Sequence, residues 1–164
     1  MAIRVVILTI SDRSYRGERP DSTGPALINL CSEKQWLIID YSTIPDELDI
    51  IQEYLTNWCE DDKTDLILTT GGTGFAPRDV TPEATLSVIQ RNAPGIAEEM
   101  RRQSMQKTPH AMLSRAIAGI CNSTLIINLP GSPKGALENL QFIIDVLPHA
   151  VELMQNDPNS ELNH

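Results

Sequence analysis

Aromatic residues, basic residues and cysteines are all scarce in this chain. Phe, Trp and Tyr make up 4% of its 164 residues, whereas hydrophobic residues make up 41%, so the predicted core is aliphatic. Lys and Arg number 13 against 22 Asp and Glu, which gives a formal net charge of −9, and the basic residues form no run. Such a surface repels a phosphate backbone, so nucleic acid is not an expected partner.

The cysteines are too few and too widely spaced for a disulfide framework or a zinc site. Cys31, Cys59 and Cys121 form no CxxC pair, and the three histidines show no metal-ligand spacing with them. We therefore expect three free thiols in a reducing compartment, each acting as a small buried apolar residue.

Long hydrophobic runs are also missing. The apolar stretch 3–10 is too short to cross a bilayer, and Asp12 and Arg13 follow it closely without the cleavage pattern of a signal peptide. We interpret the stretch as a buried first strand, and we expect a cytoplasmic protein with no membrane partner.

The order of strand and helix patterns predicts an α/β fold. Apolar runs predict strands over 3–10, 36–44, 65–70 and 123–129, and the pattern allows a short strand at 116–120. Helices are predicted over 25–34 and 45–59, from 81 to a break at 94–95, and over 96–103 and 133–146, with a last turn to 154. Alternation of this kind predicts a three-layer sandwich, a mainly parallel doubly wound sheet with helices on both faces. We expect residues 1–154 to form one domain and residues 155–164 to form a polar, mobile tail.

A glycine-rich turn follows the third predicted strand. The run Thr69-Thr70-Gly71-Gly72-Thr73-Gly74 ends that strand, and a second junction lies at Asn128-Leu129-Pro130-Gly131-Ser132. Ligands of doubly wound sheets bind beyond the carboxyl ends of the strands, where glycine amides and helix N-termini can hold an anion. The turn is neither a P-loop nor a GxGxxG motif. By itself it is equally compatible with a tight exit from the strand and with a phosphate cradle.

Three aspartates follow predicted strands at the same edge. Asp12 can cap a turn or accept a hydrogen bond from a ribose or base, and Asp46 can be a helix N-cap or a metal ligand. Asp79 lies between the glycine turn and a helix, where it can cap that helix, pair with Arg78, or coordinate Mg²⁺ that bridges to phosphate. Two acidic side chains at one edge of the sheet are the minimum set of carboxylates for a metal-assisted phosphoryl or nucleotidyl transfer.

Four segments together resemble the molybdopterin adenylyltransferase family, which includes the gephyrin G domain and its bacterial counterparts. They are TTGGTG at 69–74, PRDVTPEAT at 77–85, LSR at 113–115 and INLPGS at 127–132, and the resemblance extends from residue 11 to residue 153. It implies a Mg²⁺-dependent transfer of AMP from ATP to the terminal phosphate of molybdopterin, with release of pyrophosphate. It also implies a homotrimer whose product passes to a separate molybdenum-insertion protein.

The same resemblance implies a role for each matched residue. Asp46 and Asp79 are expected to support catalysis and to bind Mg²⁺. The glycine turn would form the nucleotide and phosphate cradle, with adenosine beside the end of the first strand. The residues expected to bind the substrates are Ser11, Asp12, Gly71, Gly72, Thr73, Gly74, Ser114, Asn128, Pro130, Gly131 and Ser132.

One departure from the family and two rival functions remain. Relatives often carry a basic residue where this chain has Cys121-Asn122, so we expect a phosphate contact to be missing there. The chain ends soon after its last predicted helix, and we expect no fused insertion domain. The alternative function is a non-catalytic molybdopterin-binding or carrier protein in the same pathway. A nicotinamide oxidoreductase is disfavoured because no GxGxxG motif is present.

Overall fold

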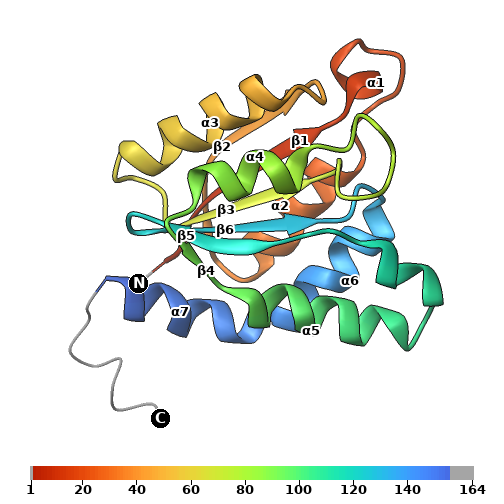
Figure 1. Cartoon of the computed structure of the whole chain (residues 1–164). Coiled ribbons are helices and arrows are strands. Elements are labelled where there is room, and N and C mark those ends of the chain that lie inside the picture. Colours follow the sequence, from red (N-terminus) through yellow and green to blue (C-terminus); the bar gives the residue numbers. More distant parts are fainter. Residues whose placement is uncertain (1, 156–164) are drawn as a thin grey trace.

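The computed structural model describes residues 2–155 and shows a mixed sheet between two layers of helices (Figure 1). The sheet order is β2-β1-β3-β6-β5-β4. Strands β1, β2, β3 and β6 are parallel, whereas β5 is antiparallel to β6 and β4 is antiparallel to β5. The strands are β1 (Arg4–Ile10), β2 (Leu37–Ile44), β3 (Leu66–Thr70), β4 (Arg91–Asn92), β5 (Ala118–Cys121) and β6 (Thr124–Leu129).

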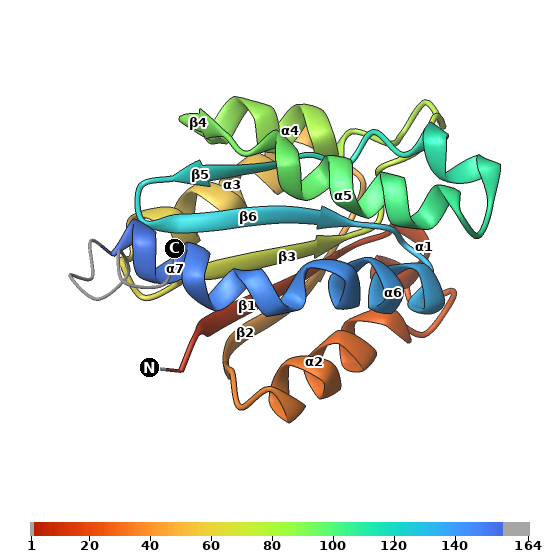
Figure 2. The ribbon, with the colours of Figure 1, turned by 90° about the horizontal axis from the view of Figure 1, so that it is seen from below.

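Helices cover both faces of the sheet, so the predicted three-layer fold is confirmed. One face carries α2 (Thr23–Glu33), α5 (Pro94–Met105), α6 (Pro133–Ile143) and α7 (Leu147–Met154), as Figure 2 shows. The other carries α3 (Leu48–Glu60) and α4 (Thr81–Val88). The short elements are α1 (Asp12–Tyr15) and the 3₁₀ helices η1 (Pro109–Leu113) and η2 (Ile144–Val146).

The central strands are buried on both faces, which explains their continuous apolar sequences. Every residue of β3 and β6 is buried. Leu66 and Leu68 belong to the core cluster beneath α2 and α6, whereas Ile67 belongs to the cluster beneath α3. Alternate side chains of β3 therefore pack against both helical layers. This packing holds the carboxyl end of the strand, from which the glycine turn extends, in a fixed position.

The strand order of the sheet reverses at β1, because β2 lies on one side of β1 and β3 lies on the other. Helix α2 leads outward from β1 to β2, and α3 then returns past β1 to β3 on its other side. Right-handed crossovers in opposite directions place these two helices on opposite faces. The loops after β1 and β3 consequently diverge and open a crevice at the carboxyl ends of the two strands.

The element boundaries depart from the predictions in several places. A four-residue helix, α1, stands where a polar loop was expected, and the Ser11 hydroxyl caps it by accepting a hydrogen bond from the Ser14 amide (3.2 Å). The helix predicted from 81 to 94–95 ends at Val88, and residues 91–92 instead form β4, because their strand character depends on pairing with β5. Helix α3 begins at Leu48 rather than at 45, and the helix predicted over 133–146 ends as α6 at Ile143, with its last three residues forming η2.

Three further expectations concern the ends, the thiols and the membrane. Gln155 is described and donates a hydrogen bond to Asp65, but the rest of the predicted tail lies outside the described residues. Cys31, Cys59 and Cys121 are free and buried, as expected. Within residues 2–155, every helix is too short or too polar to span a bilayer.

Candidate functional site

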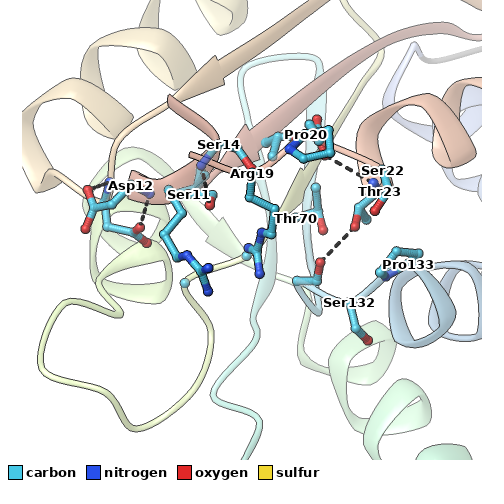
Figure 3. A pocket seen from close by; sticks show the side chains of 18 of the residues that line it. Ser11, Asp12, Ser14, Arg19, Pro20, Ser22, Thr23, Thr70, Ser132 and Pro133 are labelled. Atoms are coloured by element: carbon cyan, nitrogen blue, oxygen red, sulfur yellow. Dashed lines mark hydrogen bonds between the residues drawn. The ribbon is translucent and has the colours of Figure 1, made fainter. Parts of the chain in front are cut away.

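A polar cavity of about 540 Å³, which we call the main cavity, opens at the carboxyl ends of β1, β3 and β6. Figure 3 shows side chains from the loops after these strands around it. It lies at the point where the strand order reverses. The residues of the sequence prediction that line it are Ser11, Asp12, Asp46, Gly71, Gly72, Asp79, Gly131 and Ser132.

The glycine turn forms the floor of the main cavity. Gly71 and Gly72 have φ values of +100° and +68°, which side-chain-bearing residues rarely adopt. A Cβ at Gly71 would lie 2.2 Å from the carbonyl oxygen of Ile10, and one at Gly72 would lie 3.1 Å from Oδ1 of Asp46. The Gly71 amide donates to Leu129 (3.2 Å), whereas the amides of Gly72 and Thr73 have no acceptor among the described residues. The turn therefore joins β1, β3 and β6 and leaves two donors for an anion.

Asp12 and Asp46 hold each other through reciprocal hydrogen bonds. The Asp12 amide donates to Oδ2 of Asp46 (2.9 Å), and the Asp46 amide donates to Oδ1 of Asp12 (3.0 Å). Arg78 does not pair with Asp79; it binds Asp12 through two nitrogens (2.6 and 3.0 Å) and Glu47 through one (2.8 Å). The cap position of α3 is Glu47, so Asp46 is not its N-cap.

The electrostatic environments of these two carboxylates differ. The hydrogen bonds from Arg78 hold the pKa of Asp12 below its ordinary value. Burial raises the pKa of Asp46, and the negative charges of Asp12 and Asp79 raise it further. Asp46 therefore has an unfavourable excess of negative charge around it, which a bound cation would relieve.

Asp79 is carried by the loop between the glycine turn and α4. Its Oδ2 accepts a hydrogen bond from the Ala76 amide (3.0 Å), and a Cβ at Gly74 would lie 2.9 Å from the same oxygen. Val80 occupies the cap position of α4 without a side-chain cap bond, so Asp79 does not cap this helix. Carboxylate oxygens in surplus negative charge fit Mg²⁺, which proteins hold through one or two carboxylates together with substrate phosphates. The described residues contain no cluster of three or more His, Cys, Asp or Glu side chains that could form a complete metal cage.

A second hollow of about 340 Å³, which we call the side cavity, lies on the other side of the glycine turn. Thr73, Gly74, Ser114 and Pro130, all residues of the sequence prediction, line it. Arg101, Ser104, Lys107 and Asn139 line it from α5, the segment after it, and α6. The predicted binding residues are thus divided between two cavities that meet at residues 71–74.

Asn128 is placed elsewhere: among the described residues it lines neither cavity. Its side chain has no exposed surface and donates hydrogen bonds to the hydroxyls of Thr69 and Thr85 (both 3.0 Å). Its Oδ1 accepts from the Ile117 amide (3.2 Å). The residue stabilises the sheet below the site, and its place in a motif gave no sign of this.

Two arginines of the main cavity were missed by the sequence prediction. Arg13 and Arg19 lie in α1 and the loop that follows it, and both line the cavity. Figure 3 shows the Arg19 side chain directed into the cavity between Asp12 and Ser132. No spacing in the sequence places this loop over the sheet edge, so sequence patterns alone could not have identified these residues.

Comparisons with known proteins agree with this geometry. A family model described as "Probable molybdopterin binding domain" matches residues 6–149. The chain is 43% identical to a molybdopterin adenylyltransferase of Helicobacter pylori over 93% of its own length and 88% of that protein. It is 45% identical to gephyrin of Dictyostelium discoideum over 96% of its length, but it spans only 23% of that protein. It is also similar to the crystal structure of the molybdopterin biosynthesis enzyme MoaB of Thermus thermophilus, with a TM-score of 0.89 and 48% identity, covering 94% of this chain and 98% of that one. The chain belongs to the molybdopterin-binding domain family.

Proposed function

We propose that this protein is a molybdopterin adenylyltransferase of molybdenum cofactor biosynthesis. It would transfer AMP from ATP to the terminal phosphate of molybdopterin and release pyrophosphate. Relatives of that name are 43% and 41% identical to the chain, which covers 88% and 74% of their lengths. The observation that carries the proposal is the pair of carboxylates, Asp46 and Asp79, beside the glycine turn at the reversal of strand order.

The two cavities supply places for the two substrates. The main cavity offers phosphate oxygens the amide of Gly72 and the cation of Arg19, and the unpaired amide of Thr73 lies at the border with the side cavity. The side cavity, lined by Ser114, would take the pterin. The glycine turn between the cavities then brings the terminal phosphate of molybdopterin close to the α-phosphorus of ATP.

In this arrangement the protein contributes position and charge rather than covalent chemistry. Asp46 and Asp79 would hold Mg²⁺, which when bound neutralises phosphate charge. An oxygen of the molybdopterin phosphate attacks the α-phosphorus, and the bond from the α-phosphorus to the bridging oxygen of the β-phosphate breaks. Pyrophosphate leaves with that bonding electron pair, and the amides of the glycine turn stabilise the charge that develops on the phosphoryl oxygens.

We further propose that the protein acts in the cytoplasm as a homotrimer and passes its product to a molybdenum-insertion protein. Large apolar side chains that one copy leaves exposed, such as Leu86 (62%) and Val146 (59%), support association between copies. Light scattering on the purified protein tests the trimer, which requires three times the chain mass of 18.2 kDa.

The proposal is tested by incubating the purified protein with molybdopterin, ATP and Mg²⁺ and quantifying adenylylated pterin. Asp46→Asn and Asp79→Asn are expected to lose turnover far more than pterin affinity, because both carboxylates serve the transfer rather than the pterin. Asp49→Asn, on the exposed first turn of α3, is the matched control. Pterin binding without product, in folded protein, would instead identify a carrier.

A further inference from the structure

The loop that carries Asp79 makes few bonds of its own. The Asp79 amide donates to the carbonyl of Ala76 (2.9 Å), and the Ala76 amide donates to the Asp79 carboxylate (3.0 Å). These bonds form a local turn in residues 75–80, which contain no helix or strand. A turn of this kind keeps its shape but can still move as a unit, so contacts from outside the loop must fix Asp79 over the main cavity.

Arg115 supplies such contacts at both ends of the loop. Its Nε donates to the carbonyl of Gly74 (2.8 Å), and its Nη2 donates to the carbonyl of Asp79 (2.7 Å). The Arg115 amide also donates to the carbonyl of Thr73 (2.8 Å), and Nη1 forms an ion pair with Glu83 in the first turn of α4. One guanidinium therefore connects the beginning of the loop, its end and the following helix.

The segment that bears Arg115 is itself held in place. Nη1 of Arg101, on α5, donates to the carbonyl of Ala116 (2.6 Å), and the Ala116 amide donates to the hydroxyl of Ser114 (3.3 Å). Asn128 accepts from the Ile117 amide. These bonds give the guanidinium a fixed base between the two cavities, and its side chain is only 33% exposed.

Arg78 and Arg115 hold the same loop in chemically different ways. Arg78 neutralises Asp12, a residue of the main cavity, so its loss would change the charge that a ligand meets. Arg115 contacts backbone carbonyls and Glu83, and among the described residues it is not part of the lining of either cavity. A change at Arg115 therefore alters the placement of Asp79 while every side chain that lines either cavity keeps its identity.

We propose that Arg115 is a positioning residue that sets the Asp79 carboxylate for the transfer reaction; the kinetic part of this proposal rests on the proposed function. A lysine cannot take its place, because one ammonium group cannot reproduce the planar fork that reaches two separate carbonyls. Loss of the guanidinium leaves Asp79 in the protein but displaces its carboxylate. We therefore expect this loss to lower turnover and to raise the Mg²⁺ requirement, and to leave pterin binding unchanged.

The test is the Arg115→Lys variant beside Arg102→Lys, a surface arginine of α5 that pairs with Glu99. Arg115→Lys is expected to lower kcat by about 10- to 100-fold, the usual effect of removing a group that orients a metal-binding carboxylate. The Mg²⁺ concentration for half-maximal rate rises, while pterin affinity and the activity of Arg102→Lys remain at the wild-type level. Equal losses of kcat and pterin affinity, or a fully active Arg115→Lys, would overturn the proposal.

A double variant and a structural measurement complete the test. If Arg115 acts through Asp79, then Arg115→Lys in an Asp79→Asn background causes little further loss, whereas multiplied losses would contradict the proposal. Hydrogen exchange tests the placement without any turnover: the amides of 75–79 exchange faster in Arg115→Lys, and those of α5 do not. If the wild type makes no product, the proposed function fails, and unchanged exchange at 75–79 separately refutes the role of Arg115.

Discussion

Replacing Asn128 with alanine is expected to destabilise the fold while leaving both cavities able to bind ligand. The change removes the three side-chain hydrogen bonds to Thr69, Thr85 and Ile117 from a fully buried site. Each bond contributes about 0.5–1.5 kcal/mol net, so the free energy of unfolding falls by about 3 kcal/mol. In a domain of this size each kcal/mol corresponds to about 2–4 °C, and Tm is therefore expected to fall by about 6–12 °C.

Thermal unfolding followed by calorimetry measures this change, with ATP affinity of the folded variant measured well below its Tm. Asn92→Ala, on the exposed two-residue strand β4, is the matched control and is expected to leave Tm unchanged. An Asn128→Ala protein that keeps its Tm but loses ATP affinity would contradict this structural role of Asn128. That result would place the amide against the ligand, as the motif alone suggested.

Four other predictions concern the site. Gly71→Ala introduces a Cβ at 2.2 Å from the Ile10 carbonyl oxygen, so calorimetry should show a large loss in the free energy of unfolding. Gly17→Ala is the control: φ is also positive there but the space is open, so its loss is limited to a strain of about 1–2 kcal/mol. The pKa of Asp46 is raised in the folded state, so the protonated side chain stabilises the fold at acid pH and this stabilisation is lost as the pH rises and the carboxyl ionises. At neutral pH and without metal, Asp46→Asn should therefore unfold at a higher temperature than the wild type. The same shift places the acid limb of the rate profile above the ordinary aspartate value of 3.8, and a higher Mg²⁺ concentration should move that limb to lower pH. Arg19→Ala should weaken ATP binding by about tenfold in calorimetric titration, the effect of losing one charge-assisted contact, with Tm unchanged.

The sequence predicted those parts of the site that follow from strand direction. Continuous apolar runs identified β1, β3 and β6, and the carboxyl ends of parallel strands must share one edge. This rule was sufficient to bring Asp12, Asp46 and the two glycine junctions together around one cavity. The glycine turn itself was ambiguous from sequence. Its positive φ values fit both alternatives, and the unpaired amides of Gly72 and Thr73 support the proposed cradle.

The parts that sequence could not predict depend on contacts between distant segments. Strand β4 exists because Arg91 and Asn92 pair with β5, and no two-residue pattern can show this. Arg115 was visible as one letter of a motif, but its hydrogen bonds reach a loop about forty residues away in sequence. Asn128 belonged to another motif, yet its side chain faces the interior rather than a cavity. A motif therefore indicates where a residue belongs in the fold without telling which way its side chain points.

The most direct test of the account is the formation of adenylylated molybdopterin from molybdopterin, ATP and Mg²⁺ by the purified protein. We expect one adenylylated pterin and one pyrophosphate for each ATP consumed, and we expect Asp79→Asn to form both products far more slowly while still binding pterin. Folded wild-type protein that binds molybdopterin but forms neither product under these conditions would contradict the account.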